Sequence, residues 1–283
     1  MTTELPTTCG AAVRSSDWLD AIVCGDCLSE MPKIPAQSVD AIISDLPYGT
    51  TACKWDSVIP FASLWAEWKR LLKPGGAIVL TASQPFTSAL VMSNLKDFRY
   101  ALVWDKVNRI TGALNSRKMP MRQHEDVLVF YRALPTYNPQ MRQKERVKFG
   151  WKAGHGEHTQ YGKNRERREV TDEQRTDPNH YPTSIISVKG CGGEIKGEHP
   201  TQKPVELMRY LVLTYTNPGD VVLDPCCGSG TTCVAAKQKG RHYIGIEKEQ
   251  RYADSAKQRT HETLGMASND QDQTRPATSL TNE

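Results

Sequence analysis

The sequence predicts a doubly wound α/β sheet with mainly parallel strands, and three observations support this fold. Short β-branched, apolar runs alternate along the chain with segments whose apolar residues repeat at helical spacing. Residues 221–239 pass from a strand through a glycine-containing turn into a helix, an order typical of ligand-binding loops at the carboxyl edge of a parallel sheet. The 283 residues are enough for one large α/β domain with an inserted or appended module.

The first half of the chain predicts strands and helices in alternation. Strands are expected at 18–26, 38–44 and 77–82, and helices at 61–72 and 85–95. Lys73-Pro74-Gly75-Gly76 is expected to end the first helix, because proline cannot continue a helix and glycine suits the exit turn. Two more segments with strand character, 100–107 and 126–131, flank a polar and basic connector.

The second half repeats the alternation after a long interruption. Helices are expected at 204–215, 231–239 and 251–263, and strands at 221–223 and 243–246. The two ends of the chain are polar, so 1–16 is expected to be a flexible arm and 265–283 a disordered tail. The main α/β domain is therefore expected to comprise residues 17–131 and 199–264.

The interruption, residues 132–198, has a different character from the rest of the chain. It contains 13 Lys and Arg against 9 Asp and Glu, and this surplus of +4 equals the net charge of the whole chain. Aromatic residues are interleaved with the charges, and apolar periodicity is nearly absent. Such a stretch is either a solvated loop or a surface that presents cations to phosphates and aromatic rings to bases.

The overall composition excludes few classes of function. A net charge of +4 neither establishes nor excludes a nucleic-acid partner. No signal peptide and no run long enough to cross a membrane is evident, so a cytoplasmic protein with its eight cysteines reduced is expected.

Cys24-Gly25-Asp26-Cys27 has the spacing of a zinc or redox pair. A structural zinc site needs four ligands, usually from two such pairs. No second pair with this spacing exists, and His155 and His158 lie far away in the charged stretch. Buried thiols are therefore the favoured interpretation, and no metal is expected.

The glycine-rich turn is Asp224-Pro225-Cys226-Cys227-Gly228-Ser229-Gly230-Thr231-Thr232. Gly228 and Gly230 allow the backbone to approach a ligand closely. A phosphate-binding loop of the Walker type would need Lys after the last glycine, and a dinucleotide fingerprint would need a third glycine at position 233. Neither is present, so a nucleotide-like ligand of another kind is indicated.

Two acidic residues narrow the choice of ligand. Asp224 ends the strand that precedes the turn, where a carboxylate would repel a diphosphate but would suit a cation. Glu247 ends the next strand, the usual place for an acid that accepts hydrogen bonds from both ribose hydroxyls. S-adenosylmethionine carries an ammonium, a sulfonium and a ribose, and it fits both residues.

Asp45-Leu46-Pro47-Tyr48 follows another predicted strand and is suited to chemistry on an exocyclic amino group. The Asp45 carboxylate and the main-chain carbonyl of Leu46 can both accept N–H bonds from such a group, which stabilises the charge that develops on its nitrogen. Tyr48 can stack on a base taken out of the duplex. A simple turn at the end of a strand is the alternative interpretation.

These segments resemble the amino-group DNA methyltransferases in the permuted, β-group order, in which the catalytic tetrapeptide precedes the cofactor loop. Asp45–Tyr48 resembles that family's tetrapeptide, and 224–232 is a near-complete match to its loop. The resemblance covers residues 20–131 and 199–260. It implies a Rossmann-like sheet in which 100–107 and 126–131 form the terminal, partly antiparallel pair.

The resemblance also implies roles for single residues. His199-Pro200-Thr201-Gln202-Lys203-Pro204 is similar to the family's segment just before the cofactor loop, and there Thr201 and Lys203 would reach the methionine carboxylate. Asp26 is similar to the acid that faces the cofactor adenine. The remaining cofactor residues are expected to be Asp224, Pro225, Cys226, Gly228, Ser229, Gly230, Thr231, Thr232 and Glu247.

Leu46 departs from the proline that the family usually has. Because this position acts through its carbonyl, leucine should preserve the chemistry. The residue before Pro47 is itself restricted, however, so the local turn geometry is open.

In this motif order, 132–198 occupies the place of the target-recognition region. Its Arg and Lys are expected to contact phosphates, with Arg165, Arg167 and Arg168 as candidates. In the connector, Asn115 and Arg122 are further candidates, although a solvated loop explains them almost as well.

The sequence thus predicts a DNA methyltransferase that acts on N6 of adenine, with duplex DNA as the favoured partner. Cytosine-N4 methylation is the nearest alternative, and a catalytically silent DNA-binding regulator is another. RNA or protein-glutamine methylation generally goes with the opposite motif order. A homodimer and a restriction endonuclease partner are left open. Asp45 and Gly228 are expected to lie at one edge of the sheet.

Overall fold

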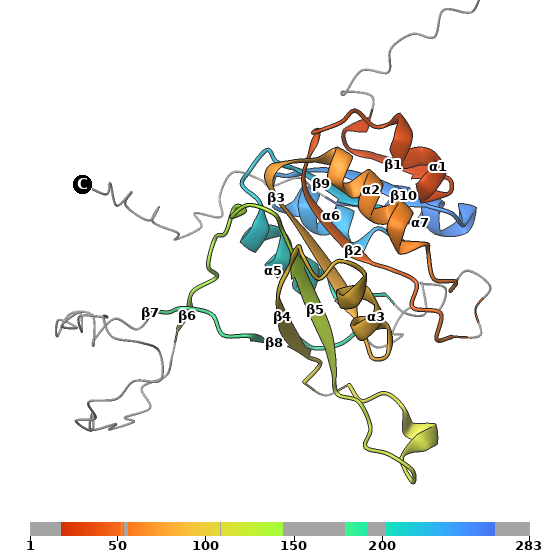
Figure 1. The fold of residues 1–283 in the computed structure, drawn as a ribbon, viewed down its shortest axis with the longest axis vertical. Helices are drawn as coiled ribbons and strands as arrows, with labels where there is room; N and C mark the ends of the chain where they lie inside the picture. Colours follow the sequence, from red (N-terminus) through yellow and green to blue (C-terminus); the bar gives the residue numbers. More distant parts are fainter. Residues whose placement is uncertain are drawn as a thin grey trace, which may run out of the picture. The chain divides into compact units, whose positions relative to one another are not determined.

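The computed structural model describes residues 18–51, 53, 56–107, 109–143, 179–191 and 202–263. An eight-stranded sheet runs through the main unit in the order β1-β10-β9-β2-β3-β5-β4-β8 (Figure 1). Its strands are β1 (Ala21–Cys24), β2 (Val39–Asp45), β3 (Leu72–Ala82), β4 (Phe98–Asp105), β5 (His124–Phe130), β8 (Ile185–Ser187), β9 (Val221–Asp224) and β10 (His242–Glu247).

Strand directions divide the sheet into two parts. β1, β10, β9, β2 and β3 are all parallel to one another. β5 is antiparallel to both β3 and β4. The expected antiparallel pair is therefore present but is not terminal, because β8 pairs in parallel with β4 through Val103–Asp105 and forms the edge.

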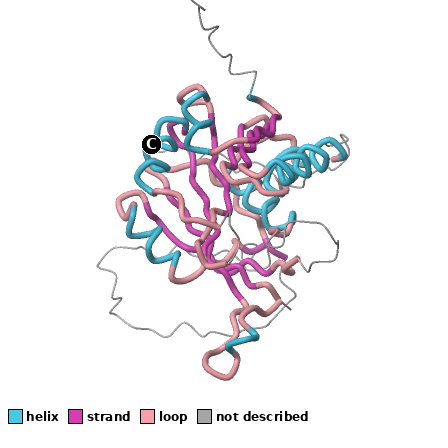
Figure 2. The backbone as a smooth tube through the Cα atoms, turned by 90° about the vertical axis from the view of Figure 1, so that its right-hand side faces the viewer, coloured by secondary structure: helices cyan, strands magenta, loops and turns pink. Residues whose placement is uncertain are grey.

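Helices cover both faces of the sheet, which confirms the doubly wound class (Figure 2). They are α1 (Cys27–Glu30), α2 (Phe61–Leu71), α3 (Phe86–Ser93), α5 (Val205–Tyr215), α6 (Thr231–Gln238) and α7 (Gln250–Glu262), with short 3-10 turns η2 (Met31–Lys33) and η3 (Ala113–Asn115). Because successive strand residues point to opposite faces, Ile43 belongs to the cluster under α5, α6 and α7, and Ile42 to the cluster under α1, α2 and α3.

The junction between α2 and β3 differs from its prediction. α2 buries Leu64, Trp68 and Leu71 along one face, as its spacing predicts, and it ends at Leu71. β3 begins at the next residue instead of after a separate turn. The Lys73–Gly76 segment forms an irregularity inside this strand, since Val39 pairs with Leu72 but Ala41 already pairs with Ala77.

The chain divides into two units, residues 1–138 with 184–283 and residues 139–183. In the second unit, β6 (Arg142–Gln143) pairs with β7 (Asn179–His180) in antiparallel fashion. The predicted recognition region 132–198 thus also contains β8, a strand of the main sheet. The predicted arm and tail lie outside the described residues. Among the described helices, none has the length and apolar content that a membrane span requires.

Candidate active site

β2 and β9 are parallel neighbours, and their carboxyl ends meet at one edge of the sheet. β3, β5, β4 and β8 extend from β2 in one direction, and β9, β10 and β1 extend in the other. This is the kind of switch point at which α/β sheets bind ligands. The hydroxyl of Ser44 donates to Asp224 over 2.7 Å. Because Ser44 precedes Asp45 and Asp224 begins the glycine-rich turn, the predicted juxtaposition of the two motifs is confirmed.

Asp45 is the centre of a polar cluster at this edge. Its Oδ1 accepts hydrogen bonds from Tyr48 at 2.7 Å and from the hydroxyl of Thr81 at 2.5 Å. Its Oδ2 accepts from Nζ of Lys203 at 2.7 Å. Thr81 pairs with Asp45 in the β2–β3 ladder, so the sheet register itself brings these side chains together. Three donors, one from the tetrapeptide itself and two from distant segments of the chain, thereby fix the orientation of the carboxylate.

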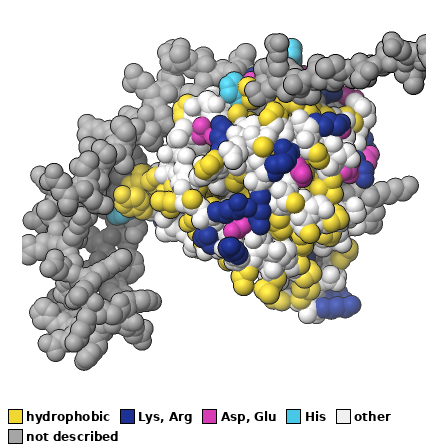
Figure 3. Space-filling model, turned by 45° about the horizontal axis from the view of Figure 1, so that its top comes forward, with side chains coloured by type: hydrophobic (Ala, Val, Ile, Leu, Met, Phe, Trp, Pro, Cys, Tyr) yellow, Lys and Arg dark blue, Asp and Glu magenta, His cyan; other side chains and the backbone are white. Residues whose placement is uncertain are grey.

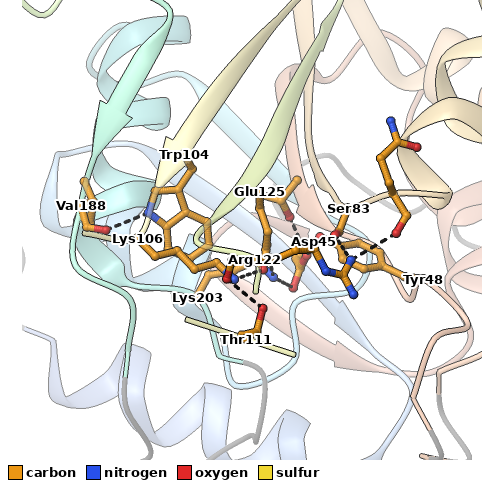
Figure 4. A network of polar contacts seen from close by, with 12 residues as sticks. Asp45, Tyr48, Ser83, Trp104, Lys106, Thr111, Arg122, Glu125, Val188 and Lys203 are labelled. Atoms are coloured by element: carbon orange, nitrogen blue, oxygen red, sulfur yellow. Dashed lines mark hydrogen bonds and ion pairs between the residues drawn. The ribbon is translucent and has the colours of Figure 1, made fainter. Parts of the chain in front are cut away.

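Lys203 connects Asp45 to a second buried ion pair (Figure 4). Its Nζ lies 3.3 Å from Glu125, and the other oxygen of Glu125 accepts from Lys106 at 2.6 Å. The charges therefore alternate along Asp45, Lys203, Glu125 and Lys106. Burial lowers the pKa of Lys203, but the two carboxylates raise it more, so the net pKa lies above its ordinary value. Lys203 remains a cation although only 8% of its surface is exposed.

Tyr48 is held by its ring as well as by its hydroxyl. The ring stacks on Phe86 with centroids 5.0 Å apart, and Nζ of Lys203 lies 5.5 Å from the ring centre. Burial raises the pKa of Tyr48 well above its ordinary value, and Asp45 and Glu125 raise it further. The phenol therefore stays protonated and continues to donate to Asp45.

The loop after the tetrapeptide is organised by a carboxylate that the sequence did not reveal. Asp56 accepts the backbone N–H groups of Gly49, Thr50 and Thr51 at 2.8, 2.9 and 2.6 Å. Burial raises the pKa of Asp56, but the Thr51 hydroxyl and the three N–H groups lower it more, so the net pKa is below its ordinary value. Asp56 thus stays ionised and closes the loop that follows Tyr48.

Asp224 lies buried at the start of the glycine-rich turn, with 3% of its surface exposed. Burial raises its pKa to about 6, although hydrogen bonds from Ser44, Thr232 and the N–H of Cys226 oppose this effect. Among the described residues, Asp224 has no cationic partner. A carboxylate that has lost water without gaining a counter-ion is suited to a positively charged ligand.

The two glycines of the turn, Gly228 and Gly230, have different structural roles. Gly228 has φ of 52° and donates its N–H to Glu247 at 2.9 Å. Gly230 has φ of 80°, and a Cβ there would come within 2.8 Å of the Cβ of Ala256 on α7. Gly230 is therefore required by helix packing, independently of any ligand. The other oxygen of Glu247 accepts the N–H of Glu249 at 2.8 Å.

The comparisons with known proteins agree with this geometry. The model of a DNA methylase family, N6_N4_Mtase, matches residues 39–258, which is more than half of the chain. The chain belongs to this DNA methylase family. Its motif order, with the tetrapeptide of β2 before the loop of β9, is the permuted β-group order.

Two curated relatives of the methylase cover most of its length. The Type II methyltransferase M.HinfI of Haemophilus influenzae is 31% identical over 87% of this chain and 70% of its own. The DNA adenine methyltransferase YhdJ of Escherichia coli K12 is 30% identical over 82% of this chain and 79% of its own.

Solved structures share the fold. The M1.HpyAVI–SAM complex is 26% identical, with a TM-score of 0.57, over 84% of this chain and 97% of its own. The PvuII cytosine-N4-specific DNA methyltransferase is only 15% identical and has a TM-score of 0.60, so it shows the fold alone.

Lys203 of the methylase pairs with Asp45 and Glu125. Its expected contact with the methionine carboxylate stays a prediction. Thr201, two residues before it, lies outside the described residues. Asp26 is exposed and caps α1 by accepting the N–H of Leu28 at 3.0 Å. It stands beside Glu247, because the N–H of Gly25 donates to the Glu247 carbonyl.

The rest of the glycine-rich turn is tied to α7 and to the segment that carries Lys203. The hydroxyl of Ser229 donates to Gln202 at 2.7 Å. Arg259 of α7 donates to the carbonyl of Ser229 at 2.6 Å and to its hydroxyl at 2.9 Å. The remaining members of the loop, Pro225, Cys226, Thr231 and Thr232, are buried or half-buried. The contact of Arg259 with this turn was not predicted, because a basic residue on an amphipathic helix carries no local signal of a loop contact.

The predicted DNA contacts fall in two places. Arg165, Arg167 and Arg168 lie outside the described residues. Asn115 is exposed in η3, on the connector between β4 and β5. The guanidinium of Arg122, on the same connector, donates to the hydroxyl of Ser83 at 2.8 Å and to the carbonyl of residue 84 at 3.2 Å.

Proposed function

We propose that this methylase transfers a methyl group from S-adenosylmethionine to N6 of adenine in DNA. The observation that carries the proposal is the position of Asp45–Tyr48 directly beside Asp224, at the carboxyl ends of two adjacent strands. A base at Asp45 and a cationic cofactor at Asp224 would then be neighbours. Direct attack of an amino group on a methyl group requires this proximity and no covalent enzyme intermediate.

Asp45 retains one acceptor position for the amino group. A carboxylate oxygen can accept about two hydrogen bonds. Oδ1 is already filled by Tyr48 and Thr81, whereas Oδ2 accepts only from Lys203 among the described residues. Oδ2 and the main-chain carbonyl of Leu46 would together accept both N–H groups of the base. These bonds stabilise the positive charge that grows on the nitrogen during attack.

Lys203 would orient the Asp45 carboxylate for hydrogen bonding to the amino group. The amino group loses its proton only after it has accepted the methyl group, so Asp45 has to accept hydrogen bonds rather than abstract a proton beforehand. A buried ammonium 2.7 Å from Oδ2 fixes the position of the carboxylate, whose oxygens serve as acceptors. Glu125 and Lys106 would hold this ammonium in place.

The residues of the β9 turn fit S-adenosylmethionine, which supplies an electrophilic methyl group when bound. The buried, unpaired carboxylate of Asp224 would face its positive charge, and Glu247 and Asp26 would face the ribose and the adenine. Thr201 and the turn residues 225–232 would complete the site. Both oxygens of Glu247 already accept one backbone N–H each, which leaves one acceptor position on each for a ribose hydroxyl.

The choice of adenine is supported by the relatives. YhdJ is named a DNA adenine methyltransferase and is similar over 82% of this chain. Residues 132–198, with Arg165, Arg167 and Arg168, would then recognise duplex DNA around the target, and Asn115 and Arg122 would contact it near Asp45.

The proposal is tested with tritium-labelled S-adenosylmethionine and unmethylated duplex DNA. The modified DNA is digested to nucleosides, and the label is expected in N6-methyl-2′-deoxyadenosine. Label in N4-methyl-2′-deoxycytidine would show that cytosine and not adenine is the target base, and no label in DNA would disprove the proposed function. Asp45→Ala is expected to reduce transfer by at least about a hundredfold, with the affinity for the cofactor retained in calorimetry.

A further inference from the structure

The connector between β4 and β5 forms a basic arm, residues 107–123. Within it are four cations, Arg109, Arg117, Lys118 and Arg122, and no Asp or Glu. Every described residue from 109 to 123 is exposed. In Figure 1 the arm is the yellow-green hairpin that extends beyond the ends of β4 and β5. It therefore adds nothing to the core, and the only charges that it presents to its surroundings are positive.

The base of the arm lies beside the catalytic carboxylate. Thr111 and Arg122 pair through two backbone hydrogen bonds of 2.8 and 2.9 Å, which closes the arm into a hairpin. Arg122 also donates to Ser83, just after the strand that carries Thr81. Lys106 and Glu125, at the two roots of the arm, belong to the ion-pair network of Asp45 (Figure 4). The base of the arm therefore adjoins the place where Asp45 would hold a target base.

The tip of the arm carries a leucine whose side chain is exposed to solvent. Leu114 sits in the 3-10 turn Ala113–Asn115 and is fully exposed, at 101% of its reference area. Ile110, Met119 and Met121 are also between 45% and 53% exposed. Apolar side chains that unstack bases are typically of these types, inserted between base steps by proteins whose cations hold the flanking phosphates.

From these observations we infer that Leu114 inserts into the base stack of duplex DNA beside the extruded adenine, while Arg117 and Lys118 contact the flanking phosphates. The inference rests on the proposed function and adds a residue that drives or stabilises base extrusion. A second copy of the chain is a less suitable occupant, because two arms of like charge would repel each other. Within the part of the chain that is described, the side chains of Arg117 and Lys118 form no ion pair.

The test uses the full-length protein and begins by mapping the site that the wild type methylates, by sequencing of modified DNA. A duplex oligonucleotide with that site then carries 2-aminopurine in place of the target adenine, and its fluorescence rises when the base leaves the stack. Leu114→Ser is expected to lose most of this rise and to lower kcat/KM on normal duplex by about tenfold. Leu114→Met should retain both, because it preserves an apolar wedge.

Two controls separate insertion from a general defect. Leu95→Ser removes another exposed leucine, 58% exposed, from the turn between α3 and β4, and it should leave both measurements unchanged. An abasic nucleotide opposite the target lowers the energy of extrusion, so on that duplex Leu114→Ser should approach wild-type rates.

The outcomes are distinguishable. If the wild type methylates no DNA, the proposed function fails and this inference fails with it. If the wild type is active and Leu114→Ser matches it in fluorescence and in kcat/KM, only the inference is wrong. A defect that the abasic duplex does not relieve, or a change in oligomeric state without a change in extrusion, would likewise overturn it.

Discussion

At the scale of single residues, two carboxylates at the same edge of the sheet, Asp45 and Asp224, differ in whether the protein pairs them with a cation. Asp45 is half-buried and has a cation at 2.7 Å. Asp224 is buried, accepts only neutral donors among the described residues, and has its pKa raised to about 6. The first therefore has a counter-ion that the protein itself supplies. The second gains its compensation only when a cation binds, which favours a charged ligand over a neutral one.

Asp224 predicts a pH dependence of cofactor binding. Its raised pKa means that the free enzyme is protonated there below about pH 6 and ionised above it. A cationic ligand prefers the ionised form, so affinity should be constant above this value and should fall by up to about tenfold per pH unit below it. Calorimetric titration with S-adenosylmethionine between pH 5 and 7 measures the effect.

The matched variant for this prediction is Asp224→Asn. It keeps the size of the side chain and the acceptor for Ser44 but removes the titration. The variant should bind S-adenosylmethionine weakly, and its affinity should not change as the pH passes through 6. Glu247, whose pKa is also raised by burial, remains in the variant. A step of unchanged size in Asp224→Asn would assign the titration to another group.

At the scale of elements, the turn before α6 shows why a motif glycine has more than one function. Gly230 adopts φ of 80°, and α7 lies where its side chain would be. Gly230→Ala should lower the free energy of unfolding by about 3 kcal/mol, from the left-handed backbone and the crowding together. Chemical denaturation monitored by circular dichroism measures the change.

Gly219 supplies the control for this prediction. Its φ is 83°, but a Cβ there would meet no atom within 4 Å. Gly219→Ala should therefore lower the free energy of unfolding by only about 1 kcal/mol, the cost of placing alanine in a left-handed backbone conformation. If both variants lost the same free energy of unfolding, crowding against Ala256 would add nothing to the effect of Gly230→Ala.

Regular elements could be predicted from the sequence where their periodicity is strong. α2 and the buried strands β2 and β9 lie within a residue or two of their expected bounds, because burial on one or two faces dictates the pattern. Short elements carry no such pattern. β8 has three residues and α1 has four, and both were missed. The strand at 77–82 was predicted, but its start at Leu72 was missed because Pro74 and Gly75 indicated a turn.

The candidate site was predictable to the extent that its residues adjoin strand ends. Asp45, Asp224 and Glu247 each end a strand, and neighbouring parallel strands bring their carboxyl ends together. Contacts between distant side chains were not predictable. Lys203 and Asp45 are 158 positions apart, and nothing local distinguishes this partner from the expected methionine carboxylate.

At the scale of the whole molecule, the charge is divided between regions with different roles. The face shown in Figure 3 carries Lys and Arg side chains together with Asp and Glu. Lys69 and Lys73, at the edge opposite the site, pair with Asp97 and Asp40. By contrast, 132–198 accounts for a surplus equal to the whole net charge. Long-range attraction to DNA should therefore depend on that region more than on the total charge.

This division predicts different effects for two triple variants. Replacement of Arg165, Arg167 and Arg168 by Gln should weaken DNA binding. It should also lower the slope of log affinity against log salt by up to about 2.7, since each phosphate contact contributes about 0.9.

Replacement of Lys69, Lys73 and Lys239 by Gln removes the same charge from the opposite edge and should leave the slope nearly unchanged. Fluorescence anisotropy with a labelled duplex at several salt concentrations measures both. Equal slopes in the two variants would show that DNA responds only to net charge, and would remove the support for 132–198 as the recognition region.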